Sequence, residues 1–171
     1  QVDALTPEGQ PNYPILILLL ETLRHLERGE QDKLISYFNL QLLQHLGYMP
    51  ELYQCVSCLS PIQPTRNTFT PALGGVICLV CDGEKTSRYS VEGSDHYAAP
   101  LSLSALKVLR FMRDNPYQLV QGLRIKSILG AELENLLRGY TSYIVERQLN
   151  TPSFLHKLRR IPDLPTSQIG P

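Results

Sequence analysis

The chain has 171 residues, of which 43% are apolar and 19% are charged, and its formal net charge is zero. This composition is that of an ordinary globular protein. The length suits one domain, or one domain with a small appendage, and allows a core without covalent staples. The longest apolar run, residues 15–20, is far shorter than the roughly 20 residues that cross a bilayer, and no basic segment precedes it. This run is therefore neither a membrane helix nor a secretory signal, and we expect a cytoplasmic protein with no membrane partner.

The charges are unevenly distributed along the chain. Residues 1–54 carry three basic and seven acidic side chains, whereas residues 55–171 carry thirteen basic and nine acidic ones. The basic second part is compatible with an anionic partner but does not require one. The chain does not open on a methionine, and residues 1–11 have a loop-like composition. We expect these residues to be a linker that follows an N-terminal domain.

Two leucine-rich helices are expected before the cysteines. Pro14 suits the start of the first helix, and Gly29 suits its end. Asp32 is expected to cap the second helix, which ends at Gly47. The short connection predicts an antiparallel pair. The apolar positions at helical spacing are expected to be core: Ile15, Leu18, Leu19, Thr22, Leu23 and Leu26 in the first helix, and Leu34, Ile35, Phe38, Leu42, Leu43 and Leu46 in the second.

Residues 48–100 interrupt the helical pattern with many prolines and glycines. Short extended pieces are expected at residues 68–70 and 76–79. Few apolar side chains are available for burial in this stretch, so we do not expect it to hold its shape alone.

Helical periodicity returns after Pro100. A helix capped by Ser102 or Ser104 is expected to end near Arg113. A short turn is predicted at residues 125–129 and a long helix at residues 131–149. A separate last helix should open at Thr151-Pro152, with threonine as the cap and proline in the first turn.

The four cysteines, Cys55, Cys58, Cys78 and Cys81, are arranged as two Cys-x-x-Cys pairs separated by nineteen residues. This spacing is typical of a two-knuckle zinc site, because each tight turn directs two sulfurs at one point. Four thiolates fill every position of a tetrahedral ion, so the expected zinc is structural and not catalytic. A redox pair and inert buried thiols are the alternatives, and the chain lacks the βαβ pattern that accompanies a thioredoxin-like pair.

We therefore predict a mainly α fold, a helical bundle with an inserted four-cysteine zinc hairpin. The helical domain is expected to cover residues 12–160, interrupted by a zinc-binding insertion at residues 48–100. Residues 161–171 are expected to be a disordered tail.

Several blocks of the sequence resemble the C-terminal part of the RecO family of bacterial recombination mediators. The first contains Phe38, Leu40, Leu42 and Leu43, continues through Leu46-Gly47-Tyr48, Pro50 and Leu52, and ends on Cys55 and Cys58. The second is Phe69 with Gly74-Gly75 ahead of Cys78 and Cys81, and a looser third runs from Leu136-Leu137-Arg138 through Tyr140, Tyr143 and Glu146 to Leu155. The resemblance covers roughly residues 14–160.

The resemblance implies a non-enzymatic function in recombinational DNA repair. Proteins of this family bind single- and double-stranded DNA, anneal complementary strands, and cooperate with RecR to load RecA onto strands coated by single-strand binding protein, whose acidic tail is a further partner. The family implies a bacterial, nucleoid-associated protein. It also implies an N-terminal OB-fold, which is absent from this chain. The alternative is a zinc-ribbon module that binds protein and never contacts DNA.

The basic residues of the second half are candidates for contact with nucleic acid or an acidic partner. These are Arg124, Lys126, Arg138, Arg147, Lys157, Arg159 and Arg160. Such side chains attract phosphates by charge and counterion release, but a solvated helix face explains them equally simply. Lys107 and Arg110 are weaker candidates, because Asp114 is placed to pair with Arg110 at four-residue spacing. The chain contains neither a phosphate-binding Gly-x-x-x-x-Gly-Lys loop nor a Gly-x-Ser-x-Gly nucleophile motif, so we predict no enzyme and no small-molecule substrate.

Overall fold

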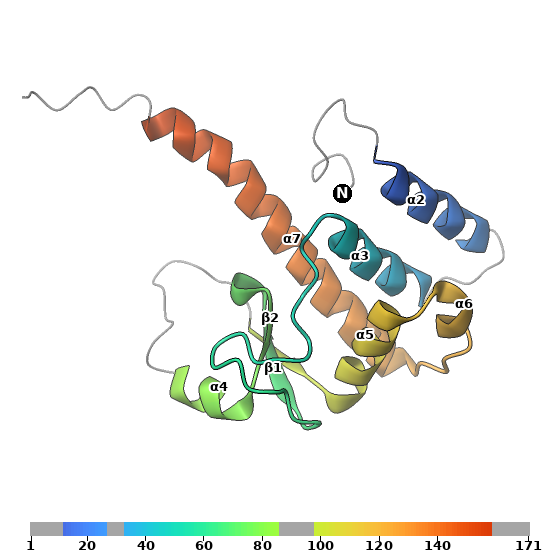
Figure 1. The fold of residues 1–171 in the computed structure, drawn as a ribbon, viewed down its shortest axis with the longest axis horizontal. Coiled ribbons are helices and arrows are strands. Elements are labelled where there is room, and N and C mark those ends of the chain that lie inside the picture. Colours follow the sequence, from blue (N-terminus) through green and yellow to red (C-terminus); the bar gives the residue numbers. More distant parts are fainter. Residues whose placement is uncertain (1–11, 27–32, 86–97, 159–171) are drawn as a thin grey trace, which may run out of the picture.

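The computed structural model describes residues 12–26, 33–85 and 98–158 of the chain, and Figure 1 labels its elements. The predicted fold class, a mainly helical body with a four-cysteine insertion, is confirmed. None of the helices in these three ranges is both long and apolar enough to cross a membrane. In chain order the elements are α2 (Tyr13–Leu26), α3 (Leu34–His45), β1 (Asn67–Thr70), the 3-10 helix η1 (Pro71–Leu73), β2 (Gly75–Ile77), α4 (Leu79–Lys85), β3 (Ala99–Leu101), α5 (Leu103–Asp114), α6 (Tyr117–Val120) and α7 (Ser127–Leu158).

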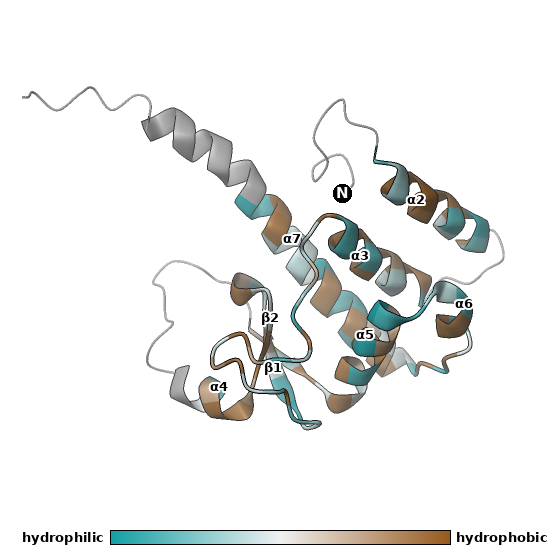
Figure 2. Ribbon diagram, viewed as in Figure 1, coloured by the Kyte–Doolittle hydropathy of each residue, from teal (hydrophilic) through white to brown (hydrophobic). Residues whose placement is uncertain are grey.

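Helices α2 and α3 pack against each other and run in opposite directions, as predicted from the short connection (Figure 1). The side-chain oxygen of Asn12 accepts a hydrogen bond from the Ile15 N–H at 3.3 Å and so caps the start of α2. Ile15 and Leu18 are buried against α3, but Leu23, predicted as core, is 48% exposed. Because α2 packs on α3 through one stripe only, the apolar side chains on its outer face remain exposed. Figure 2 shows brown, apolar segments along this helix beside teal, hydrophilic ones. The end predicted at Gly29 and the cap predicted at Asp32 lie outside the described residues.

Helix α3 buries Leu34, Leu42 and Leu43 as predicted, but the rest of its buried stripe departs from the prediction. Ile35 is 46% exposed, whereas Leu40, which was not predicted as core, is fully buried. The helix ends as predicted at Gly47, which has a φ of 78°. The Gly47 N–H donates to Gln44 O at 3.1 Å and the Tyr48 N–H donates to Leu43 O at 2.7 Å. These two bonds satisfy the last carbonyls of the helix and turn the chain toward the cysteine-bearing segment.

A three-stranded antiparallel sheet of order β2-β1-β3 forms the centre of the insertion (Figure 1). The two extended pieces predicted at residues 68–70 and 76–79 correspond to β1 and β2, but β2 ends at Ile77 and α4 begins at Leu79. Strand β3 was not predicted, because three residues are too few to show an alternating pattern.

Gly75 allows a close approach between the start of the insertion and β2. The Val76 N–H donates to Glu51 O at 2.9 Å, and the Glu51 N–H donates to Gly74 O at the same distance. A β-carbon added at Gly75 would lie 2.6 Å from Glu51 O, closer than atoms tolerate. Glycine is therefore required here by packing and not by its backbone angles.

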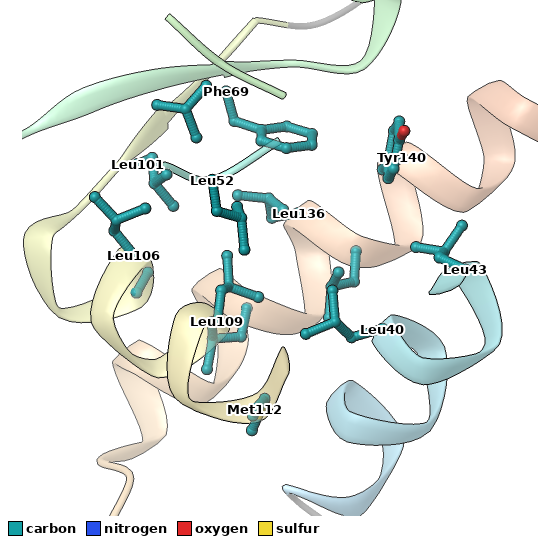
Figure 3. Close-up of a cluster of buried hydrophobic side chains, with 14 of the residues drawn as sticks. Leu40, Leu43, Leu52, Phe69, Leu101, Leu106, Leu109, Met112, Leu136 and Tyr140 are labelled. Carbon is teal, nitrogen blue, oxygen red and sulfur yellow. The ribbon is translucent and has the colours of Figure 1, made fainter. Parts of the chain in front are cut away.

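One hydrophobic core joins the helices to the insertion (Figure 3). Leu52, Phe69 and Val76 from the insertion are buried in the same cluster as Leu137 and Leu109 from the helices. The expectation that residues 48–100 have little to bury is therefore wrong for the described part of this stretch. Side chains such as Leu52, Phe69 and Val76 are buried in this core, even though others, such as Leu59 and Val80, are exposed. The division into a 12–160 domain and a 48–100 insertion stays a prediction.

The C-terminal helices differ from the predicted ones in their bounds. Helix α5 begins after Ser102, whose hydroxyl accepts from the Ala105 N–H at 3.1 Å, as predicted. The short α6 was not predicted. Helix α7 starts at Ser127 and continues through Pro152 to Leu158, so the separate last helix predicted at Thr151-Pro152 is wrong. A proline inside a helix removes one backbone donor and favours a bend, but the helix can continue beyond it.

Candidate metal centre and basic surface

The four cysteine thiols come from two turns that the fold brings together. Cys55 and Cys58 lie on a loop closed by the Cys55 N–H to Ser60 O and Leu59 N–H to Cys55 O bonds, both 2.8 Å long. Cys78 follows β2, and Cys81 lies in the first turn of α4. All four sulfurs lie within 4.8 Å of one another. The sequence spacing therefore does correspond to a single cluster.

The dimensions of the cluster fit a tetrahedral thiolate site. Four sulfurs bound at about 2.3 Å to one ion lie about 3.8 Å apart, and the Cys58 and Cys78 sulfurs are 3.8 Å apart. All four cysteines are free thiols, and a disulfide would need a sulfur separation near 2.05 Å. Soft thiolates in this geometry suit zinc or iron. The residues present can therefore hold one metal ion.

Hydrogen bonds to the sulfurs prepare the site for a cation. The Cys78 N–H donates to the Cys55 sulfur at 3.4 Å. Burial raises the pKa of Cys55, but the N–H groups of Cys78, Cys58 and Ser57 outweigh it and leave the pKa below its usual value. The Ser60 hydroxyl and N–H lower the pKa of Cys58 to about 6. The neighbouring Cys58 sulfur raises the pKa of Cys81 to about 12. Without a cation, Cys81 thus keeps its proton, which a metal would displace.

The difference in pKa between Cys58 and Cys81 predicts which cysteine reacts first when metal is removed. In chelated, reduced protein at pH 7, iodoacetamide should label Cys58 ahead of the others, because Cys58 is exposed and its pKa of about 6 makes it a thiolate. The labelling rate should fall as the pH drops through 6, because protonation removes the nucleophile. Peptide mass spectrometry at short reaction times measures the order. Cys81 labelled first would contradict the assignment, and Cys58→Ser should leave only slow thiols.

Helix α5 anchors the segment that leads to the first cysteine pair. The Arg110 guanidinium donates to Leu52 O through Nε at 3.0 Å and through Nη2 at 2.6 Å, and it lies 4.6 Å from the centre of the Tyr53 ring. The Tyr53 hydroxyl donates to Asp114, whose ion pair is with Arg113 at 3.9 Å. The expected Arg110–Asp114 pair is therefore replaced by contacts that position Cys55. The sequence carries no signal for these contacts, because they join residues about sixty positions apart.

Among the predicted basic residues whose side chains the structure describes, it brings together Arg124 and Lys126. Arg124 and Lys126 are exposed in the connection between α6 and α7. Arg138 is exposed on α7, where it donates to Asn135 Oδ1 at 2.7 Å, and Arg147 is exposed further along. These two lie about 2.5 helical turns apart and so point to opposite sides of α7. Lys157 lies in α7 with a side chain outside the described part, and Arg159 and Arg160 also lie outside it.

These observations describe a mainly helical domain that holds four thiols beside a small antiparallel sheet. Comparison with known proteins gives the family. Residues 2–152 match the family described as "Recombination protein O C terminal". The chain belongs to this family.

Individual proteins named DNA repair protein RecO also match this chain over most of its length. The chain is 36% identical over 161 residues to "DNA repair protein RecO" of Roseiflexus sp. (strain RS-1), a match that covers 94% of this chain and 53% of that protein. The protein of the same name from Symbiobacterium thermophilum is 37% identical over 164 residues, with 92% of this chain and 60% of that protein covered. The protein of the same name from Dehalococcoides mccartyi (strain CBDB1) is 32% identical over 155 residues, a match that covers 90% of this chain and 57% of that protein. The chain thus spans little more than half of these relatives. No solved structure gives a significant match.

Proposed function

We propose that this chain is the zinc-binding, helical part of a non-enzymatic recombination mediator. In this proposal it contributes to binding of single- and double-stranded DNA and to strand annealing in recombinational repair, together with RecR, RecA and single-strand binding protein, in the bacterial cytoplasm. The observation that carries the proposal is the family match over residues 2–152, with relatives named DNA repair protein RecO.

A structural zinc ion is the proposed cofactor, with Cys55, Cys58, Cys78 and Cys81 as its ligands. The 3.8 Å separation of the Cys58 and Cys78 sulfurs and the pattern of N–H donors to Cys55 support it. Zinc would supply a crosslink and no reaction chemistry, since four thiolates leave no position for water or substrate.

For the nucleic-acid contact we favour Arg124 and Lys126, which are exposed together on one short connection. Helix α7, which follows them, has no acidic residue in its first turn, so no carboxylate there repels a phosphate. The more distant Arg138, Arg147, Lys157, Arg159 and Arg160 remain proposed contacts for DNA or an acidic partner.

Salt-dependent binding of a fluorescent single-stranded oligonucleotide tests the proposal. The unmodified chain should bind, and log Kd should rise linearly with log salt. Replacing Arg124 and Lys126 by glutamine should reduce that slope by roughly 1.4, because each lost phosphate contact accounts for about 0.7 on a single strand. The matched control is Arg24→Gln with Arg66→Gln, which also removes two exposed cations, one on α2 and one just before β1. No binding by the unmodified chain at low salt, or equal slopes for both double variants, would count against the assignment.

A protein-binding module is the second candidate, and exposed apolar side chains favour it. Leu59 is 71% exposed, Val80 is 70% exposed and Leu79 is 56% exposed. All three adjoin the metal ligands, so the crosslink would hold them in place. Retained function in a repair assay after all DNA contact is lost would favour this candidate.

A further inference from the structure

The connection between α6 and α7, residues 121–126, is held at its start by Lys33, which lies far from it in the sequence. The Lys33 ammonium donates to Gln121 O at 2.5 Å and to Leu123 O at 2.8 Å. These carbonyls follow the last turn of α6, where a helix leaves its carbonyls without partners. One cation thus satisfies two acceptors that the local chain leaves open, and the bonds are of the stronger, charge-assisted kind.

Aromatic packing holds α6, the helix that precedes the connection. The Tyr117 ring of α6 lies 4.5 Å from the His25 ring of α2 and 5.3 Å from the Tyr37 ring of α3. Val120, at the end of α6, is fully buried. The connection therefore leaves a rigid element, and Lys33 extends that rigidity past the helix end.

Burial alternates along the rest of the connection. Leu123 and Ile125 are partly buried and pack against the core, whereas Arg124 and Lys126 are exposed. The two cations therefore point outward from residues 123–126, while Leu123 and Ile125 are held inward. Fixing the carbonyl of Leu123 fixes the residue that directly precedes the first of these cations.

We infer that Lys33 is a positioning residue for phosphate contact: it clamps the α6–α7 connection and so presents Arg124 and Lys126 to nucleic acid as one unit. The inference rests on the proposed DNA-binding function. Lys33 acts here through the two residues it positions and is not itself a phosphate ligand. Preorganised cations bind better than mobile ones because less conformational entropy is lost on binding.

Two variants of Lys33 separate clamping from charge. Lys33→Met keeps an unbranched side chain, one atom shorter, but removes every donor, whereas Lys33→Arg retains donors that reach two carbonyls. In the protein alone, amide hydrogen exchange at residues 122–127 should accelerate in the methionine variant and return to normal in the arginine variant. Unchanged exchange in Lys33→Met would overturn the clamp, whatever the protein does with DNA.

A double-mutant cycle on oligonucleotide binding tests the link to phosphate contact. Lys33→Met alone should weaken binding by roughly three- to tenfold, the scale of coupling between residues that act together. The same change in the Arg124→Gln, Lys126→Gln background should have no further effect. An equal loss in both backgrounds would overturn the inference, because Lys33 would then be an independent phosphate contact. No binding by the unmodified chain would overturn the proposed function and the phosphate role, while the exchange measurement would still decide the clamp.

Discussion

Removal of the metal is expected to unfold the insertion and to weaken the helical body with it. Structural zinc sites of this kind contribute about 10–16 kcal/mol in small peptides, as much as the whole stability of an ordinary domain. Purified, reduced protein should contain one zinc per chain. On chelation, amide protection should disappear first in residues 51–85, then in the parts of α5 and α7 that share their core.

The cysteine variant and its control lie in the same turn. Cys81→Ser should lose the metal and reproduce the effect of chelation, whereas Leu79→Ser should keep it, because the Leu79 side chain is exposed and donates no ligand. Elemental analysis, hydrogen exchange and thermal unfolding measure these outcomes. The structural role would be refuted by an unchanged unfolding transition after chelation, or by the absence of metal in fresh protein.

Phe69→Ala should destabilise the whole protein by about 3–5 kcal/mol, the usual cost of deleting a buried aromatic side chain. Phe69 is 1% exposed, and its ring meets the Tyr140 ring of α7 edge to face at 5.3 Å and 83°. Figure 3 shows Phe69 and Tyr140 at the meeting point of sheet and helix. Because the side chain joins the insertion to α7, urea unfolding followed in either part should shift together.

The control is Leu73→Ala in η1, four residues away, where the side chain is exposed and the expected loss is within about 0.5 kcal/mol. A loss below about 1 kcal/mol for Phe69→Ala, or separate transitions for insertion and helices, would contradict the shared core. Separate transitions would instead support residues 48–100 as an independent unit.

The features that could be predicted from the sequence are governed by neighbours along the chain. Gly47 ends α3 because only a residue at ease with positive φ closes that turn. Ser102 caps α5 because its hydroxyl reaches an N–H three residues ahead. The four thiols meet because two tight turns at the right spacing each direct a pair of sulfurs to one point.

Which helix faces are buried, and which charged side chains make contacts, depends on how the elements pack together. Helical spacing cannot tell whether Ile35 or Leu40 faces the core, because that depends on where α5 and α7 pack against α3. Lys33 resembles any surface lysine until the fold brings α6 to it, eighty-eight positions along the chain. Contacts of this kind leave no local periodicity, since their partners are chosen by the packing of whole elements.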